Sequence, residues 1–328
     1  MLRAIVLGAS LLAIAFAAEA QTPAPAPTPA KAAAPAKKPA MKPPAMKLEE
    51  KFALGADNVK IHYVVSGPAN APLVVMVHGF PDYSETWSEL TPKLNDAYRA
   101  VAVDTRGYNL SGQPKGVENY AMPKLVADLA AVIKAEGRDK AIVIGHDWGA
   151  AQAWAFEFAH PDMVDKLIIL SVPHPTAFAR ELATNPQQYQ NSLYARNFQK
   201  EGSESALTAE GLASMSTKDP VEKPKYVEAF KRSDFAAMMN YYRANYPSGA
   251  NQPAKDAPPP SNPPINVPVL VIHGMKDTAL LASGHAGTWN YVTKDTTILM
   301  IPDAGHWVQH DAADLVNKTI RSWLDVRK

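Results

Sequence analysis

The chain has 328 residues, with 33 basic residues, 32 acidic residues and no cysteine. The lack of cysteine excludes a thiol nucleophile, a thiolate metal site and a CxxC redox centre. Six of the basic residues but only one acidic residue lie in positions 1–47, so the remaining chain is slightly acidic, which argues against nucleic-acid binding.

The chain begins with the pattern of a signal peptide. One basic residue, Arg3, precedes an apolar run over 4–18, which ends in the small-residue cleavage motif Ala18-Glu19-Ala20. We therefore expect cleavage before Gln21 and export to the periplasm or the outside of a bacterial cell. An uncleaved membrane anchor is the alternative, although the run is short for a permanent span.

Residues 1–20 are thus interpreted as the signal peptide and residues 21–47 as a linker. The linker is almost entirely Ala, Pro and Lys, so it has few backbone donors and little apolar side chain to bury. We expect an extended spacer whose lysines are solvated or touch an anionic surface. The roughly 280 residues from Leu48 onward suit one large domain with an inserted subdomain.

Apolar, strand-like runs recur along this large domain. They lie at 61–66, 73–77, 99–103, 141–144, 167–171, 269–272 and 297–301. Several of them are continuously apolar, which is typical of strands buried on both faces of a parallel sheet. Amphipathic segments lie between them, at 123–136, 150–159 and 311–324. The alternation predicts an α/β fold with a mostly parallel, doubly wound sheet.

The alternation lapses between about 174 and 262. This segment is rich in tyrosine and phenylalanine, and it ends in the proline-dense runs 258–260 and 263–264. Such a block between two core strands predicts an inserted helical cap over 174–264. The core would then comprise residues 48–173 and 265–328.

The segment Gly145-His146-Asp147-Trp148-Gly149 directly follows the run 141–144 and precedes a helical segment. This is the strand–turn–helix setting of a nucleophile elbow, but the usual central serine is replaced by Asp147. A carboxylate that attacks an ester would give an anhydride, whereas attack on a saturated carbon leaves an alkyl ester that water can cleave. The elbow therefore predicts an epoxide or an alkyl halide as the substrate. The alternative is an aspartate that only caps the following helix.

Hydrolysis of that ester requires a base, and the chain order in this fold class is nucleophile, acid, histidine. Asp277 follows the run 269–272, and His306 follows the run 297–301, so both are expected at the same sheet edge as Asp147. We predict that His306 deprotonates water and that Asp277 orients its imidazole. The loop after 167–171 offers no carboxylate, which favours Asp277.

Other histidines carry weaker signals. His78, His146 and His273 lie at strand ends and are interpreted as structural. His306 and His310 are four residues apart, but no HExxH motif or third ligand accompanies them, so we expect neither a metal nor a cofactor.

The loop after the run 73–77 reads His78-Gly79-Phe80-Pro81. The backbone N–H groups of Phe80 and Trp148 are expected to face the carbonyl oxygen of Asp147 during ester hydrolysis. We expect the substrate pocket to be lined by His78, Pro81, Trp148 and Trp307.

Taken together, these segments resemble the epoxide hydrolase branch of the α/β-hydrolase superfamily. The matching segments are HGFP at 78–81, DTRGYNLS at 104–111, GHDWGA at 145–150, SVPHP at 171–175, KD at 276–277 and AGHW at 304–307. They extend over nearly the whole region from 50 to 325 in the order of the family. The resemblance implies an α/β-hydrolase fold with Asp-His-Asp machinery.

The resemblance also implies two cap tyrosines that bind the epoxide oxygen and assist its protonation. Tyr242 lies in the segment Asn240-Tyr241-Tyr242-Arg243, and Tyr194 lies four residues before Phe198. Haloalkane dehalogenases share the Asp elbow, but their halide site typically uses a second Trp, or an Asn at the position of Phe80, and 176–265 contains no Trp. The expected substrates are thus a small hydrophobic epoxide and water. A dehalogenase and a binding protein without turnover are the alternatives, and the oligomeric state is open.

Overall fold

The computed structural model describes residues 48–247 and 262–328. The predicted signal peptide and linker, together with part of the predicted cap, lie outside the described residues. Within the described ranges, no helix is long and apolar enough to cross a membrane.

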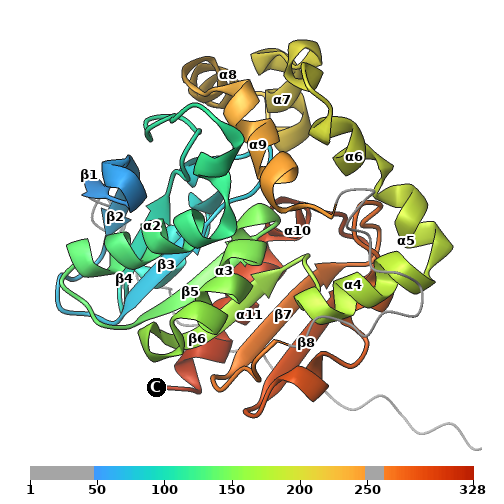
Figure 1. The fold of residues 1–328 in the computed structure, drawn as a ribbon. Helices are drawn as coiled ribbons and strands as arrows, with labels where there is room; N and C mark the ends of the chain where they lie inside the picture. Colours follow the sequence, from blue (N-terminus) through green and yellow to red (C-terminus); the bar gives the residue numbers. More distant parts are fainter. Residues whose placement is uncertain (1–47, 248–261) are drawn as a thin grey trace, which may run out of the picture. The chain divides into compact units, whose positions relative to one another are not determined.

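An eight-stranded sheet forms the centre of the fold, with strand order β1-β2-β4-β3-β5-β6-β7-β8. The strands are β1 Glu49–Leu54, β2 Lys60–Ser66, β3 Leu73–Val77, β4 Arg99–Val103, β5 Ala141–His146, β6 Val164–Leu170, β7 Val269–Gly274 and β8 Thr296–Ile301. β2 pairs antiparallel with β1 and β4, and the remaining pairs are parallel (Figure 1). The predicted α/β fold with a mostly parallel sheet is confirmed.

β1 is the one strand that the sequence pattern does not predict. It lies at the edge of the sheet, and its sequence EEKFAL leaves Phe52 and Leu54 exposed while burying Ala53. An antiparallel edge strand is buried on one side only and carries many charged residues, so it lacks the continuous apolar signature of the central strands.

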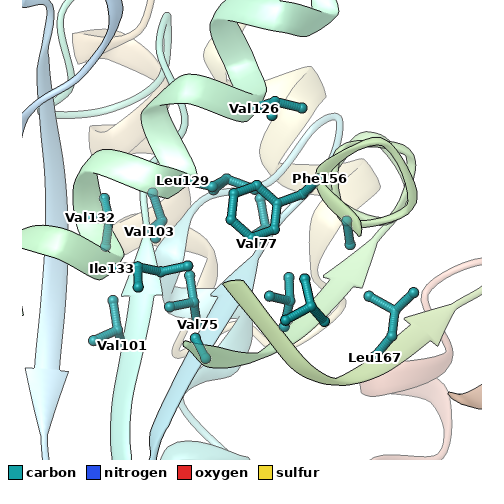
Figure 2. Packing of buried hydrophobic residues seen from close by; sticks show 14 of the residues in the cluster. Val75, Val77, Val101, Val103, Val126, Leu129, Val132, Ile133, Phe156 and Leu167 are labelled. Carbon is teal, nitrogen blue, oxygen red and sulfur yellow. The ribbon is translucent and has the colours of Figure 1, made fainter. Parts of the chain in front are cut away.

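Helices cover both faces of the sheet. Successive side chains along each strand point to opposite faces, so they pack against different helices. Val75, Val77, Val101 and Val103 point toward α2 (Met122–Ala135) and α3 (Trp148–Ala159), where Leu129, Val132, Ile133 and Phe156 meet them (Figure 2). The alternate residues of β3 and β4, among them Val74, Met76, Ala100 and Ala102, pack on the other face with α11 (Ala313–Asp325). Each fully buried valine contributes about 1.5–3 kcal/mol. Burial on both faces accounts for the continuously apolar runs.

Among the described residues between β6 and β7 there are six α-helices, drawn in yellow-green to orange in Figure 1. They are α4 Pro175–Thr184, α5 Pro186–Asn191, α6 Leu193–Gln199, α7 Ala209–Ser216, α8 Lys223–Arg232 and α9 Phe235–Asn245. Aromatic side chains of α6, α8 and α9 form a third apolar cluster with Phe80 and Trp148 of the core. The inserted helices therefore stand over the loops that follow β3 and β5.

A buried ion pair secures the segment after β4. Arg106 is fully buried, and its guanidinium donates from Nε and Nη2 to the two carboxylate oxygens of Asp128 on α2, each at 2.6 Å. The carbonyl of Arg106 accepts a hydrogen bond from the hydroxyl of Tyr241 on α9 at 2.8 Å. The same residue thus connects the core to the helix that carries Tyr242.

Candidate active site

Asp147 occupies a sharp turn between β5 and α3. Its backbone has φ 49° and ψ −123°, a conformation that a non-glycine residue adopts only under strain. The turn also requires Gly149, because a Cβ atom there would lie 2.1 Å from the carbonyl oxygen of Val77. This geometry is that of a nucleophile elbow, and it lifts the carboxylate beyond the end of β5.

The loop after β3 contacts the Asp147 carboxylate through its backbone. The N–H of Phe80 donates to Asp147 Oδ1 at 2.7 Å. A Cβ atom at Gly79 would lie 2.3 Å from the same oxygen, so only glycine allows this approach. Trp148, the other predicted donor, is the first residue of α3. The backbone N–H of Phe80 therefore lies where a donor to the ester carbonyl oxygen is required. Its role in an oxyanion hole stays a prediction.

His306 lies between two carboxylates that come from different strand ends. Its Nδ1 donates to Asp277 Oδ2 at 2.7 Å, and its Nε2 lies 3.3 Å from Asp147 Oδ2. The other oxygen of Asp277 accepts hydrogen bonds from Ala279 N at 2.8 Å and Leu280 N at 2.9 Å. The three residues that the sequence placed after β5, β7 and β8 are thus brought into contact.

The backbone of His306 is held by groups that sequence reasoning did not single out for this purpose. Its carbonyl accepts hydrogen bonds from Ser171 Oγ at 2.7 Å and from His146 Nε2 at 2.9 Å. Because the carbonyl only accepts, His146 carries its proton on Nε2, and its Nδ1 accepts from Gln309 Nε2 at 3.2 Å. His146 was interpreted as structural, and in the structure it orients the loop of His306.

The charges of these residues reinforce one another. Burial disfavours the imidazolium, but the carboxylates of Asp277 and Asp147 outweigh this effect and raise the pKa of His306 to about 10. Burial likewise disfavours both carboxylates, yet His306 and nearby N–H groups hold the pKa of Asp147 and of Asp277 below its ordinary value. The site therefore rests as an imidazolium between two carboxylates.

A cavity of about 650 Å³ opens on Asp147 and is bordered by Trp148, Tyr194 and Tyr242. The rings of the two tyrosines lie 6.3 Å apart in an edge-to-face arrangement. Burial and the charge of Asp147 raise the pKa of both Tyr194 and Tyr242 well above its ordinary value, so both hydroxyls remain protonated donors. The two predicted cap tyrosines therefore share one cavity with the predicted nucleophile.

Three of the four predicted pocket residues lie elsewhere. His78 is fully buried beneath the loop, where its Nε2 accepts from Thr105 N at 3.1 Å, and Pro81 is buried with its carbonyl bonded to Ser216 Oγ. Trp307 borders a second cavity, of about 430 Å³, on another side of His306. Only Trp148 lines the cavity of Asp147, because closeness in sequence to the site does not set the direction of a side chain.

Much of the cavity wall comes from residues without a motif. It includes Trp154, Phe158, Phe178, Leu182 and Leu280. The one sequence signal that could have indicated these wall residues is the apolar face of each of the helices α3 and α4 next to the elbow. Over residues 48–247 and 262–328, no group of three or more His, Cys, Asp or Glu side chains is arranged to hold a metal ion.

Comparisons with known proteins agree with the fold. A family model described as alpha/beta hydrolase fold matches residues 72–313. Epoxide hydrolase 1 of Caenorhabditis elegans is 32% identical over 306 residues, which cover 88% of this chain and 74% of the relative.

Two solved structures extend the comparison. The Bacillus megaterium epoxide hydrolase in complex with an inhibitor has a TM-score of 0.76 and 30% identity, and the match covers 84% of this chain and 100% of that one. An epoxide hydrolase from metagenomes of hot environments has a TM-score of 0.76 and 31% identity, over 85% and 99% of the two chains. The chain therefore belongs to the α/β-hydrolase superfamily, in its epoxide hydrolase branch.

Proposed function

We propose that this protein hydrolyses apolar epoxides to vicinal diols through a covalent ester on Asp147. The observation that carries the proposal is a single cavity in which a carboxylate on a strained turn lies with two protonated tyrosines, while a paired histidine contacts that carboxylate. A carboxylate nucleophile, an acid for the epoxide oxygen and a base for water are the groups that this reaction needs.

In the first step Asp147 attacks a ring carbon of the epoxide. Oδ1 accepts from the N–H of Phe80, the predicted oxyanion donor, so Oδ1 becomes the ester carbonyl oxygen. Oδ2, which lies 3.3 Å from His306 Nε2, forms the new C–O bond. The C–O bond of the ring breaks, and the departing oxygen takes a proton from the hydroxyl of Tyr194 or Tyr242. The carbonyl oxygen then already faces the donor that stabilises charge on it in the next step.

In the second step water cleaves the ester. Ester formation removes the negative charge of Asp147, which is one of the causes of the raised pKa of His306. The imidazolium therefore releases its proton more readily, and this proton restores the tyrosinate left by the first step. The neutral imidazole then accepts a proton from water, and the hydroxide attacks the carbonyl carbon. The acyl C–O bond breaks, and His306 protonates the leaving alkoxide. The carboxylic acid formed on Asp147 then gives its proton to His306, so the diol departs and the carboxylate–imidazolium pair is regenerated.

The cavity supports an uncharged, apolar substrate. Among the described residues that line it, Asp147 is the only charged one, and most of the wall is aromatic or aliphatic. A carboxylate on the substrate would lose its hydration there without gaining a partner, and an ammonium would find only the nucleophile itself. Aryl and alkyl epoxides are therefore the preferred class.

Replacement of His306 by Gln tests the proposal. The variant should accumulate an ester on the peptide that contains Asp147, with a mass increase equal to that of the epoxide, and Asp147→Asn should give no adduct. Aromatic and aliphatic epoxides should both be offered. Absence of an adduct with all of them contradicts the proposal, and halide release from alkyl halides without epoxide turnover would indicate a dehalogenase.

A further inference from the structure

Gln188 differs from the other glutamines of its helix. α5 begins after Asn185, whose side chain accepts hydrogen bonds from the N–H groups of Gln187 and Gln188. Gln187 and Gln190 are exposed, whereas Gln188 is fully buried. A buried amide is costly unless its donors and acceptor are paired, so its partners indicate what it does.

Both ends of the Gln188 amide bind the loop after β7. Its Nε2 donates to Ala279 O at 2.8 Å, and its Oε1 accepts from Leu281 N at 2.8 Å. The side chain thus pairs with the loop as the backbone of a neighbouring strand would. These bonds fix the path of the chain from 279 to 281.

That loop holds the acid of the site. The N–H groups of Ala279 and Leu280 donate to Asp277 Oδ1, which leaves Oδ2 to accept from His306 Nδ1. A displacement of the loop would therefore turn the carboxylate away from the imidazole.

Gln188 also reaches the helix of Tyr194. Its side-chain Nε2 donates to Ser192 Oγ at 3.0 Å, and its backbone carbonyl accepts from Ser192 N at 3.0 Å. Ser192 directly precedes α6, and Tyr194 lies in the first turn of that helix. The buried amide thus lies between the acid loop and the cap tyrosine.

We propose that Gln188 is a positioning residue that sets Asp277 and Tyr194 in register with each other. The inference rests on the proposed function, because it assigns effects to the two chemical steps. Gln188 acts on the first step through Tyr194 and on the second step through Asp277 and His306. It touches neither the substrate nor the reacting atoms.

A second contact holds the region of α4 and α5 against the segment after β7 without the help of Gln188. Asn185 Nδ2 and Ser283 Oγ both donate to Glu181 Oε2, at 2.9 and 2.7 Å. Gln188→Met retains the volume of the side chain and removes only its hydrogen bonds, so the docked arrangement should persist with a looser register.

The test is single-turnover kinetics of the full chain with styrene oxide, following formation and decay of the Asp147 ester by rapid-quench mass spectrometry. Gln188→Met should slow both steps about 10- to 100-fold, the cost of a small misplacement of reacting groups. The apparent pKa of ester hydrolysis should fall, because a displaced Asp277 no longer holds a proton on His306. The matched controls Gln187→Met and Gln190→Met should behave as the wild type.

A second variant keeps the test informative if Gln188→Met does not fold. Ser192→Ala removes the bond between the Gln188 side chain and Ser192, together with the contact of Ser192 to Tyr246, and it keeps the bonds of Gln188 to residues 279–281. It should therefore slow ester formation and leave the pH profile of ester hydrolysis unchanged. A fall in melting temperature with unaltered rate constants and pH profile would overturn the role of Gln188. Failure of the ester to form in the wild type and in His306→Gln would instead contradict the proposed function.

Discussion

His306 Nε2 lies 3.3 Å from Asp147 Oδ2, and this contact joins the predicted base to the predicted nucleophile. Both side chains are largely withdrawn from solvent, so each charge stabilises the other more strongly than it would in water. The contact can exist as an ion pair only while Asp147 is a free carboxylate. In the proposed reaction, formation of an ester on Asp147 would therefore lower the pKa of His306, and the two steps should respond differently to pH.

The first prediction concerns this pH dependence. Ester hydrolysis requires neutral imidazole, so its rate constant should rise with pH and level off above the apparent pKa of His306 in the ester. That pKa should lie below the value of about 10 that His306 has beside the free carboxylate. Ester formation needs ionised Asp147, whose pKa is lowered, so it should be flat through the neutral range. Rapid-quench measurements across pH check both profiles, and a hydrolysis rate that falls with rising pH would contradict this assignment.

The second prediction concerns the two cap tyrosines. Removal of both hydroxyls in Tyr194→Phe/Tyr242→Phe should slow ester formation by about 10²-fold or more, the usual contribution of a positioned acid. Decay of the ester should change little, because the epoxide oxygen is already protonated by then. Tyr241→Phe is the matched control, since that hydroxyl binds Arg106 O outside the cavity. An equal loss in the control would show that the effect is structural.

The third prediction concerns the loop that approaches Asp147. In Gly79→Ala the new Cβ would lie 2.3 Å from Asp147 Oδ1, so the carboxylate and the Phe80 N–H must separate. We expect kcat/KM for epoxides to fall by roughly 10²–10³-fold, as on loss of an oxyanion donor. Gly137→Ala is the control, because its Cβ meets no atom within 4 Å, although its positive φ costs about 1–2 kcal/mol of stability. Full activity in Gly79→Ala would exclude the Phe80 contact from catalysis.

The fourth prediction concerns stability. Arg106→Met leaves the buried carboxylate of Asp128 without its partner, which should lower the free energy of unfolding by about 3–5 kcal/mol. The double change Arg106→Met/Asp128→Leu should recover part of that loss. Urea denaturation measures both, with the exposed pair Lys318–Asp314 as a control that should cost less than about 1 kcal/mol when Lys318 is replaced. A comparably small loss in Arg106→Met would mean that water reaches Asp128.

Several features of the fold followed from local patterns alone. The continuous apolar runs predicted the central strands, and α2, α3 and α11 lie within two residues of the segments predicted for them. The edge strand β1 was not predicted, because a strand that is exposed on one side lacks the continuous apolar run of a strand buried on both faces.

The part of the candidate site that lies at the ends of strands could be predicted from the sequence. Parallel strands bring their carboxyl ends to one edge, so Asp147, Asp277 and His306 were expected to meet, and they do. Their chemical roles, like those of Tyr194 and Tyr242, stay predictions until kinetics test them.

The sequence by itself determined the identity of the group in the elbow, a carboxylate at Asp147, and this group predicts chemistry at saturated carbon. Only the tertiary structure decided that His78, Pro81 and Trp307 do not line the cavity, and that Gln188 connects the loop of Asp277 to the start of the helix of Tyr194. The physical reason is the range of the interactions. Periodic burial and turn geometry are local along the chain, whereas the direction of a side chain depends on partners that folding brings from distant positions.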